Sequence, residues 1–363
     1  MPNRHHDLLS GLLIVLALPM AAWAAQHQVP EDFQTIQEAI DQAGRGDIVS
    51  IAPGRYRETI DLKGKAIVLK GRGDSPTILD GTDLKGSVVR CVSGEGPLTR
   101  LDRLVVISGS GDQGEYGDKA TVGGGLLLVG ASPTISNCQF QGNVVTYNGG
   151  GVYARNSNSQ FTACGFAGNT AEKGGGVYAS RSTLSFTSCT FEQNNAIFGG
   201  GAVFSDNRSD TTIVQGMFSE NRASFNGGAL YDYDSATTVT DSIFLNNMGA
   251  YKGGAAYHGW RSRGRFGEGN EFRTPNDDIA GSARSLNQAD PLGACFVGGS
   301  CILTRKSACQ EAAGTWAGPD TRCDETDAPD TGKQGPKGDL NADGRVDVLD
   351  MAILMGTWGR RGE

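Results

Sequence analysis

The chain has 363 residues and a formal net charge of −8, and 20% of its residues are charged. No block of basic residues stands out, so we expect neither a nucleic-acid partner nor attraction to anionic membranes. Glycine supplies 54 residues, and its periodic placement indicates repeated tight backbone rather than disorder.

Residues 1–24 have the layout of a secretory signal peptide. Arg4 belongs to a polar start, residues 8–20 form an apolar run, and Ala22-Trp23-Ala24 is a small-x-small cleavage site. The apolar run is too short to span a bilayer comfortably. We therefore expect a secreted protein, extracellular or at the cell surface, with no transmembrane segment in the mature chain. An uncleaved anchor is the alternative, and periplasm and medium both stay open as destinations.

The mature chain begins with a predicted helix. Phe33, Ile36, Ile40 and Ala43 follow helical spacing. This helix would cover a strand edge that could otherwise pair with another chain, so we predict an N-terminal helical cap. Short strands are expected next, at residues 48–51, 66–69, 87–90 and 104–107.

A repeat of about 26 residues then runs through the middle of the chain. Its glycine clusters start at Gly123, Gly149, Gly174, Gly199, Gly227 and Gly253. Its second element is a Phe-x-x-Asn pair, which occurs at Phe140/Asn143, Phe166/Asn169, Phe191/Asn194, Phe218/Asn221 and Phe244/Asn247. A period of this length with short alternating apolar runs is typical of one turn of a parallel β-helix.

Equivalent positions form columns in such a coil, because each turn stacks on the last. We expect the phenylalanines to form a buried column and the asparagines to bond along the stack within a turn. The glycines would form the opposite corner. Cys138, Cys164 and Cys189 share one offset and are expected to pack as small apolar residues. Disulfides between them are the alternative.

These residues carry a family resemblance. The stretch FQTIQEAIDQAGRGDIVSIAPGRYRETIDLKGKAIVLKGRGDSPTILDG, from Phe33 to Gly81, resembles the start of right-handed β-helix proteins of the pectin lyase-like superfamily. The Gly-Gly-Gly/Ala and Phe-x-x-Asn pairs resemble those of the polymorphic membrane protein family. The resemblance implies an all-β fold, a right-handed parallel β-helix (solenoid) over residues 28–284. It implies no single activity, since the superfamily includes lyases, hydrolases, esterases, adhesins and inert scaffolds.

A small Cys-rich segment follows at residues 285–324. It contains Cys295, Cys301, Cys309 and Cys323. Two disulfides are expected in an exported chain, three pairings are open, and a zinc site is the alternative. Residues 325–337 are predicted to be a flexible linker.

Residues 338–361 carry a predicted calcium loop. Oxygen donors stand at positions 1, 3, 5, 9 and 12 of twelve residues, and a backbone carbonyl stands at position 7. These ligands are Asp339, Asn341, Asp343, Asp347, Asp350 and the carbonyl of Arg345. Ca²⁺ takes 6–8 oxygens in such loops, with glycine at position 6, here Gly344.

The loop resembles the EF-hand-like calcium loop of dockerin modules. This resemblance implies a cohesin-like or surface protein as partner of the tail. Dockerins usually carry two loops and this chain carries one, so it is a half-module, and cohesin binding stays open.

The repeat also predicts a candidate site. Counted from the glycine starts, Asp232 and His258 share offset 5, and three further residues share offset 7. Stacking would place them on one outward patch, where paired carboxylates could do acid–base work and aromatic rings could bind sugars. The candidate residues are Asp206, Arg208, Asp232, Asp234, His258 and Trp260.

The spacing points to the same region. From Gly149 to Phe166 is 17 residues, whereas 19 residues separate Gly199 from Phe218 and Gly253 from Phe272. The predicted function is a structural, adhesive or carbohydrate-binding role, with a polysaccharide or cell-surface glycan as partner. The calcium-binding tail would attach the protein. A polysaccharide lyase or glycoside hydrolase is the alternative, although no motif of either class maps onto specific positions.

Overall fold

The computed structural model of the chain describes residues 24–113, 120–273 and 279–281, the strands at 292–297, 300–305 and 315–316, and residue 309. The predicted signal peptide up to residue 23, the linker and the calcium loop lie outside these residues. Among the described residues, no helix has the length and apolar character needed to cross a membrane.

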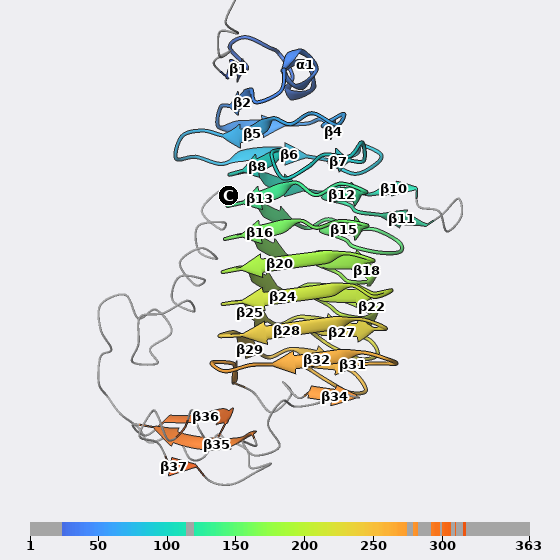
Figure 1. Cartoon of the computed structure of the whole chain (residues 1–363), viewed down its shortest axis with the longest axis vertical. Helices are drawn as coiled ribbons and strands as arrows, with labels where there is room; N and C mark the ends of the chain where they lie inside the picture. Colours follow the sequence, from blue (N-terminus) through green and yellow to red (C-terminus); the bar gives the residue numbers. More distant parts are fainter. Residues whose placement is uncertain are drawn as a thin grey trace, which may run out of the picture.

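The described chain coils into a right-handed parallel β-helix, as the repeat predicts (Figure 1). The turn that starts at Gly149 contributes β15 (Val152–Arg155), β16 (Gln160–Thr162), β17 (Gly165–Ala167) and β18 (Thr170–Lys173). Each of these strands pairs in parallel with its equivalent one turn later. The coil therefore has one parallel sheet for each strand position.

Four sheets line the coil, and we name them A to D. Sheet A is β1 (Gln26–Val29), β2 (Ile48–Ile51), β5 (Val68–Gly71), β8 (Arg100–Asp102), β13 (Thr134–Ser136), β16, β20 (Thr183–Thr187), β24 (Asp210–Val214), β28 (Ala236–Thr240) and β32 (Arg263–Phe266). Sheet B is β3 (Gly54–Tyr56), β6 (Thr77–Asp80), β9 (Val105–Ile107), β14 (Gln139–Gln141), β17, β21 (Thr190–Glu192), β25 (Met217–Ser219), β29 (Ile243–Leu245), β33 (Glu271–Phe272), β36 (Ser300–Arg305), β35 (Leu292–Val297) and β37 (Thr315–Trp316).

Sheets C and D complete the turns. Sheet C is β4 (Ile60–Asp61), β7 (Val89–Cys91), β12 (Leu126–Val129), β15, β19 (Val177–Ser180), β23 (Val203–Asp206), β27 (Leu230–Tyr233), β31 (Ala256–His258) and β34 (Ile279–Gly281). Sheet D is β18, β22 (Asn195–Gly199), β26 (Arg222–Ala223) and β30 (Met248–Gly249). A small ribbon, β10 (Asp112–Gln113) with β11 (Thr121–Val122), projects from the coil.

The predicted N-terminal helix is α1 (Ile36–Gln42). Thr35 caps it, and Glu38 completes a capping box by accepting from the Thr35 backbone. Its buried residues Ile36, Ala39 and Ile40 belong to the main core. It lies at the end of the stack beside β1 and β2 (Figure 1). Its role as an edge-covering cap stays a prediction.

The phenylalanine column fills the interior. Phe166, Phe191, Phe218 and Phe244 are stacked with ring centroids 4.7–4.8 Å apart, a separation close to the spacing of neighbouring strands. All four are fully buried. Since burial of one such side chain contributes about 1.5–3 kcal/mol, the column is a main source of stability.

The asparagine column forms a buried hydrogen-bond ladder. Asn143, Asn169, Asn194, Asn221 and Asn247 are all 0% exposed. The Nδ2 of Asn194 donates to the carbonyl of Phe166 (2.8 Å) and to Oδ1 of Asn221 (2.9 Å). The Asn194 backbone N–H also donates to this Oδ1 (3.1 Å). The pattern repeats from turn to turn, so the buried amides are satisfied by their neighbours.

The cysteine column packs as predicted. Cys138, Cys164 and Cys189 are free thiols in the core. Each Sγ donates to the carbonyl two residues earlier, at 3.1–3.5 Å. Burial raises the pKa of the Cys138 thiol to about 12, so this thiol stays protonated and unreactive at neutral pH.

The glycine corner has a steric reason beyond the turn itself. Gly149 has φ +67, and a Cβ on Gly150 or Gly151 would lie 2.6 Å from a backbone oxygen of the next turn. The positive φ falls on Gly200 rather than on Gly199. The start predicted at Gly199 is therefore one residue early, and the distance to Phe218 is 18 residues rather than 19.

A bulge in sheet D causes this shift. Lys173 pairs with Gly199, while Ala171 pairs with Ala196. Two residues, Ile197 and Phe198, therefore stand opposite Glu172 alone. The extra residue moves the following corner by one position.

The last turn of sheet B continues into an antiparallel hairpin. Phe272 of β33 pairs with Leu303 of β36, and β36 pairs with β35. The hairpin holds two of the clustered cysteines, Cys295 and Cys301, in its strands. Cys309 is buried, and the pairing of the cluster stays a prediction.

The ladder yields a stability prediction. Asn194→Ala removes four buried hydrogen bonds and leaves carbonyl, N–H and amide groups without partners, each at a cost of about 1–3 kcal/mol. We expect the free energy of unfolding to fall by more than about 2 kcal/mol in urea titrations. The exposed Asn158 is the matched control, because Asn158→Ala should change it by less than about 0.5 kcal/mol. Equal effects of both substitutions would contradict the ladder's role.

Candidate functional site

The predicted patch is divided between the inside and the outside of the coil. Asp232 and His258 are register partners in sheet C, as their shared offset predicts. Their side chains are 1% and 0% exposed and point into the coil. The prediction that they belong to an outward patch is therefore wrong, because β27 and β31 extend through these positions and alternate residues of a strand face opposite sides.

Inside the coil, Asp232 and His258 form a tight polar pair. His258 Nδ1 lies 2.6 Å from Oδ2 of Asp232, and the Thr237 hydroxyl donates to Oδ1 of Asp232 at 2.5 Å. One turn earlier, the hydroxyls of Ser205 and Thr211 bond to each other at 2.9 Å. The inward column is apolar at Ala154 and Ala179 and becomes polar from Ser205 onward.

Gly264 makes room for the histidine. A Cβ at this position would lie 2.0 Å from the His258 ring atoms Cε1 and Nε2. The His258 ring, the Asp232 carboxylate and the Thr237 hydroxyl therefore fill the part of the interior that other side chains occupy in other turns of the coil. The two side chains bond to each other within the core, and neither is accessible to a substrate outside the coil.

The outward members of the predicted patch lie in different columns. Asp206 pairs in register with Tyr233 rather than with Asp234, which follows from the one-residue shift at Gly199. The Asp206 carboxylate accepts from the hydroxyl of Tyr178 at 2.7 Å. Arg208, whose side chain is 87% exposed, lies 4.0 Å from Asp234. These carboxylates do not converge on one point.

Trp260 nevertheless forms an exposed aromatic group. Its ring centroid lies 5.9 Å from that of Tyr233, and the guanidinium of Arg261 lies 4.3 Å above its ring. Trp260 is 56% exposed and Tyr233 is 43% exposed. The arginine covers one face of the Trp260 ring, and the rest of this aromatic pair is open to solvent.

A second aromatic column lies outside the coil, on the outer face of sheet C. Tyr153, Tyr178, Phe204 and Tyr231 are stacked and buried. The glycine corners fold over them, since a Cβ on Gly199 would lie 2.5 Å from the Tyr231 ring. Burial raises the pKa of the Tyr231 phenol to about 12. This column packs the corner and is not a free binding surface.

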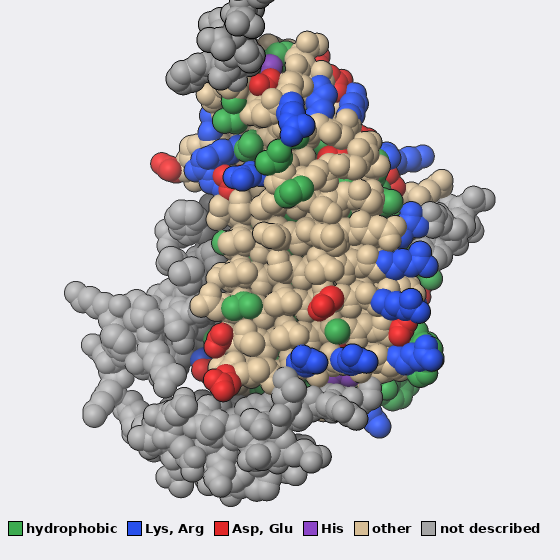
Figure 2. All heavy atoms as spheres, in the orientation of Figure 1, with side chains coloured by type: hydrophobic (Ala, Val, Ile, Leu, Met, Phe, Trp, Pro, Cys, Tyr) green, Lys and Arg blue, Asp and Glu red, His purple; other side chains and the backbone are tan. Residues whose placement is uncertain are grey.

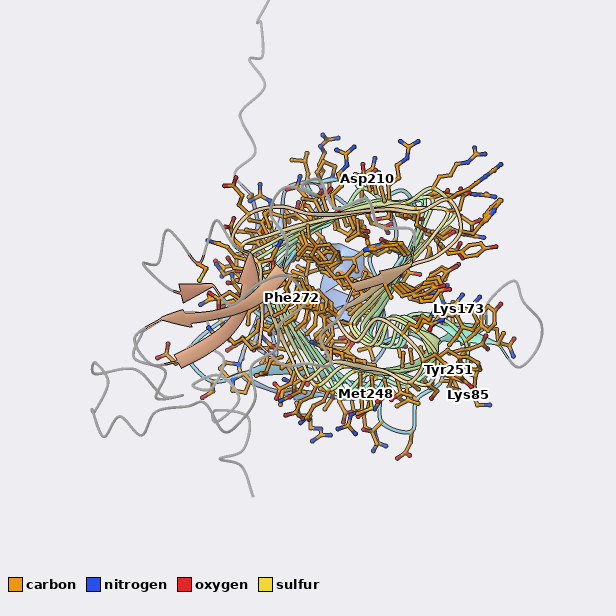
Figure 3. The ribbon with its side chains drawn as sticks, turned by 90° about the horizontal axis from the view of Figure 1, so that it is seen from below. Lys85, Lys173, Asp210, Met248, Tyr251 and Phe272 are labelled. Atoms are coloured by element: carbon orange, nitrogen blue, oxygen red, sulfur yellow. The ribbon has the colours of Figure 1, made fainter. Side chains whose placement is uncertain are left out.

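The outer face of sheet D differs from the other faces, because exposed large apolar side chains gather there. They are Val144, Ile197, Phe198, Phe225, Met248 and Tyr251. Met248 and Tyr251 lie on one side of the coil in Figure 3, and Asp210 of sheet A lies on the opposite side. Figure 2 shows few charged or apolar side chains on the outer face of sheet A over β20, β24 and β28.

The exposed rings of sheet D contact one another in a row. The centroids of Phe198 and Phe225 are 5.9 Å apart, and those of Phe225 and Tyr251 are 5.5 Å apart. The row ends at the bulge, where Glu172 replaces an aromatic residue. There the Nζ of Lys173 lies 5.3 Å from the Phe198 ring centroid. The rings form an apolar stripe along the coil.

A polar pocket of about 190 Å³ opens beside this stripe. Gln193, Asn195, Glu220 and Arg222 line it. The Gln193 amide donates to the Glu220 carboxylate at 2.9 Å, and Asn195 pairs in register with Arg222. We name this set the sheet D pocket. It gathers two amides, a carboxylate and a guanidinium from two consecutive turns.

The asparagine ladder positions these four side chains. Gln193 and Asn195 flank Asn194, and Glu220 and Arg222 flank Asn221. Because the ladder side chains point inward and are fully buried, their neighbours in sequence are presented at the surface. Gln193 and Glu220 adopt the left-handed conformation, with φ of 52 and 54.

The sheet D pocket is absent from the sites predicted above, although the sequence holds a signal for it. The residues that flank the ladder asparagine are Gly142 and Val144, Gly168 and Thr170, Gln193 and Asn195, Glu220 and Arg222, and Asn246 and Met248. Long hydrogen-bonding side chains stand on both sides in two adjacent turns. The offsets counted from the glycines and phenylalanines do not single out these positions.

The described residues contain no cluster of three or more His, Cys, Asp or Glu side chains that could hold a metal ion. The predicted calcium ligands, from Asp339 to Asp350, lie outside the described residues. No described feature therefore tests the calcium loop.

One comparison with known proteins agrees with the observed fold. The sequence family described as "Right handed beta helix region" matches residues 119–272. No curated protein matches the chain.

Three solved structures are similar at low identity. Escherichia coli YbhC is 14% identical, with 63% of this chain and 75% of that chain covered and a TM-score of 0.39. Rice weevil pectin methyl esterase is 13% identical, with 68% and 88% covered and a TM-score of 0.38. Pectin methylesterase PemA from Erwinia chrysanthemi is 10% identical, with 74% and 91% covered and a TM-score of 0.37. These values assign no activity to the chain.

The buried pair generates a second prediction. Asp232→Ala removes the buried group to which both His258 and Thr237 bond, and leaving a buried polar group without its partner costs about 1–3 kcal/mol. We expect a marked drop in the thermal unfolding midpoint, measured by circular dichroism. Asp234→Ala, at a half-buried neighbour on the outside, should have little effect. A surface role for Asp232 would instead leave stability unchanged.

Proposed function

We propose that this protein is a secreted, non-catalytic β-helix protein that binds carbohydrate on the outer face of sheet D and is attached through a calcium-binding, dockerin-like tail. The observation that carries the binding proposal is the sheet D pocket, where two amides, a carboxylate and a guanidinium converge beside exposed apolar side chains. The secreted location rests on the signal-like N-terminus and on the dockerin-like loop.

The composition of the pocket suits a sugar. Carboxylate, guanidinium and amide groups each offer paired oxygen or nitrogen atoms, which match the neighbouring hydroxyls of a pyranose. Apolar side chains beside these groups suit the C–H faces of the sugar ring. Ile197 stands two residues beyond Asn195 on β22, and Met248 is the register partner of Arg222, so apolar side chains adjoin the pocket in two directions.

We favour a binding function over a catalytic one because of the positions of the carboxylates. Asp232 and His258, which the sequence places in the candidate patch, are enclosed within the coil. Asp206 and Asp234 stand apart outside. In the sheet D pocket, Glu220 is the single carboxylate and Gln193 donates to it. Glycosidase chemistry usually uses two opposed carboxyl groups.

The second part of the proposed function is attachment through the C-terminal tail. One dockerin-like loop with ligands at Asp339, Asn341, Asp343, Arg345, Asp347 and Asp350 would bind one Ca²⁺. A cohesin-like or other surface protein is the proposed partner. Attached in this way, an elongated coil would hold a bound glycan away from the attachment point.

The binding proposal predicts the effect of pocket substitutions. Native gels cast with hydroxyethylcellulose, galactomannan, xylan or alginate should retard the mature protein in at least one polymer. Arg222→Ala should weaken that retardation by about tenfold or more, because a hydrogen bond to a charged group contributes about 1.5–3 kcal/mol. Arg265→Ala, on the outer face of sheet A, is the matched control.

Two results would count against this site. Retardation that is lost in Trp260→Ala but kept in Arg222→Ala would move the site to the patch predicted from the sequence. Shortened polymer after incubation with the wild-type protein would establish an enzyme instead.

The tail generates a separate prediction. Calorimetric titration of the mature protein should show one Ca²⁺ bound, and Asp343→Ala should abolish the heat because it removes the ligand at position 5. Asp330→Ala, in the predicted linker, should leave the titration unchanged. If the wild-type protein takes up no Ca²⁺, the attachment part of the proposal is wrong and the glycan part stands.

A further inference from the structure

The dimensions of the sheet D pocket restrict what it can bind. Its volume of about 190 Å³ is below the roughly 300–1,000 Å³ of pockets that hold drug-sized ligands. The four lining residues come from two consecutive turns only, which lie about 4.8 Å apart along the coil. This space suits one sugar ring rather than a longer stretch of chain.

The neighbouring turns add little to the pocket. At the equivalent positions, the preceding turn carries Gly168 and Thr170, and the following turn carries Asn246 and Met248. A glycan that continued along the coil would therefore gain only the Thr170 hydroxyl in one direction or the Asn246 amide in the other. By contrast, the bound ring would meet Gln193, Asn195, Glu220 and Arg222 together.

The charges of the pocket limit the kind of sugar. Arg222 and Glu220 contribute one charge of each sign, so the pocket has no net charge. An acidic sugar would gain from the guanidinium but would meet the carboxylate at the same time. A neutral sugar avoids this conflict, because its hydroxyls can donate to the carboxylate and accept from the guanidinium and the amides.

We infer that the sheet D pocket recognises a single neutral sugar unit with adjacent hydroxyls, at a chain end or on a branch of a glycan. This inference rests on the proposed carbohydrate binding and specifies its ligand. Many branch ends on one polymer would then engage many copies of the protein, as an adhesive role requires.

Ligand length provides the test. The Kd of the mature protein is measured by NMR titration with glucose, mannose, galactose and galacturonate. The same titration is then carried out with oligosaccharides of two to five units, prepared from the polymer that retards the protein. We expect a neutral monosaccharide to bind more tightly than galacturonate, and the Kd to change less than about threefold from the disaccharide onward.

Substitutions identify the pocket in the same titrations. Glu220→Gln keeps the shape of the side chain and removes its charge, so binding of the neutral sugar should weaken about tenfold. Glu268→Gln, at an exposed turn on another part of the coil, should leave the Kd unchanged. Unfolding midpoints of both variants establish that any loss of binding is not a loss of fold.

The outcomes separate this inference from the proposed function. An affinity that rises tenfold or more with each added pair of sugars, or tighter binding of galacturonate, would overturn the single-sugar inference and leave glycan binding in place. An unchanged Kd in Glu220→Gln would also overturn it. If no polymer and no sugar binds, the proposed function and the inference both fall.

Discussion

In-register stacking of one turn on the next is the constraint on which this structure depends. A parallel coil places equal positions above one another at strand spacing, so any polar group that turns inward must find its partner in the adjacent turn. The asparagine ladder meets this condition, because each buried amide donates to the next asparagine and to a phenylalanine carbonyl. Phenylalanine rings stack beside it at the same separation.

The same constraint explains what happens where the repeat changes. From Ser205 onward the inward column becomes polar, and the new polar side chains bond to one another across the interior or in the next turn. Gly264 supplies the space that the His258 ring needs. A buried pair of this kind adds little net stability over an apolar core, but loss of either member would leave a buried polar group unpaired. In the sequence alone, these polar residues of the interior resemble residues of a surface site.

The candidate site, the sheet D pocket, is a structural consequence of the asparagine ladder. Asn194 and Asn221 must be buried, so their sequence neighbours are presented at the surface, and polar side chains at these places in two adjacent turns line an open pocket. The coil supplies rigidity, and the proposed specificity rests on the four side chains that line the pocket. Different residues beside the ladder could therefore change the ligand without changing the fold.

The repeat period determined the coil, its core columns, the glycine corners and the free cysteines, because each of these depends on residues that recur at one offset. Whether the side chains of Asp232 and His258 point into or out of the coil depended on tertiary structure. A strand that extends by one or two residues decides which side chains turn inward. The bulge at Ile197 and Phe198 shifted the corner to Gly200 and separated Asp206 from Asp234. The sheet D pocket likewise exists only when residues 27 positions apart, such as Gln193 and Glu220, are stacked side by side.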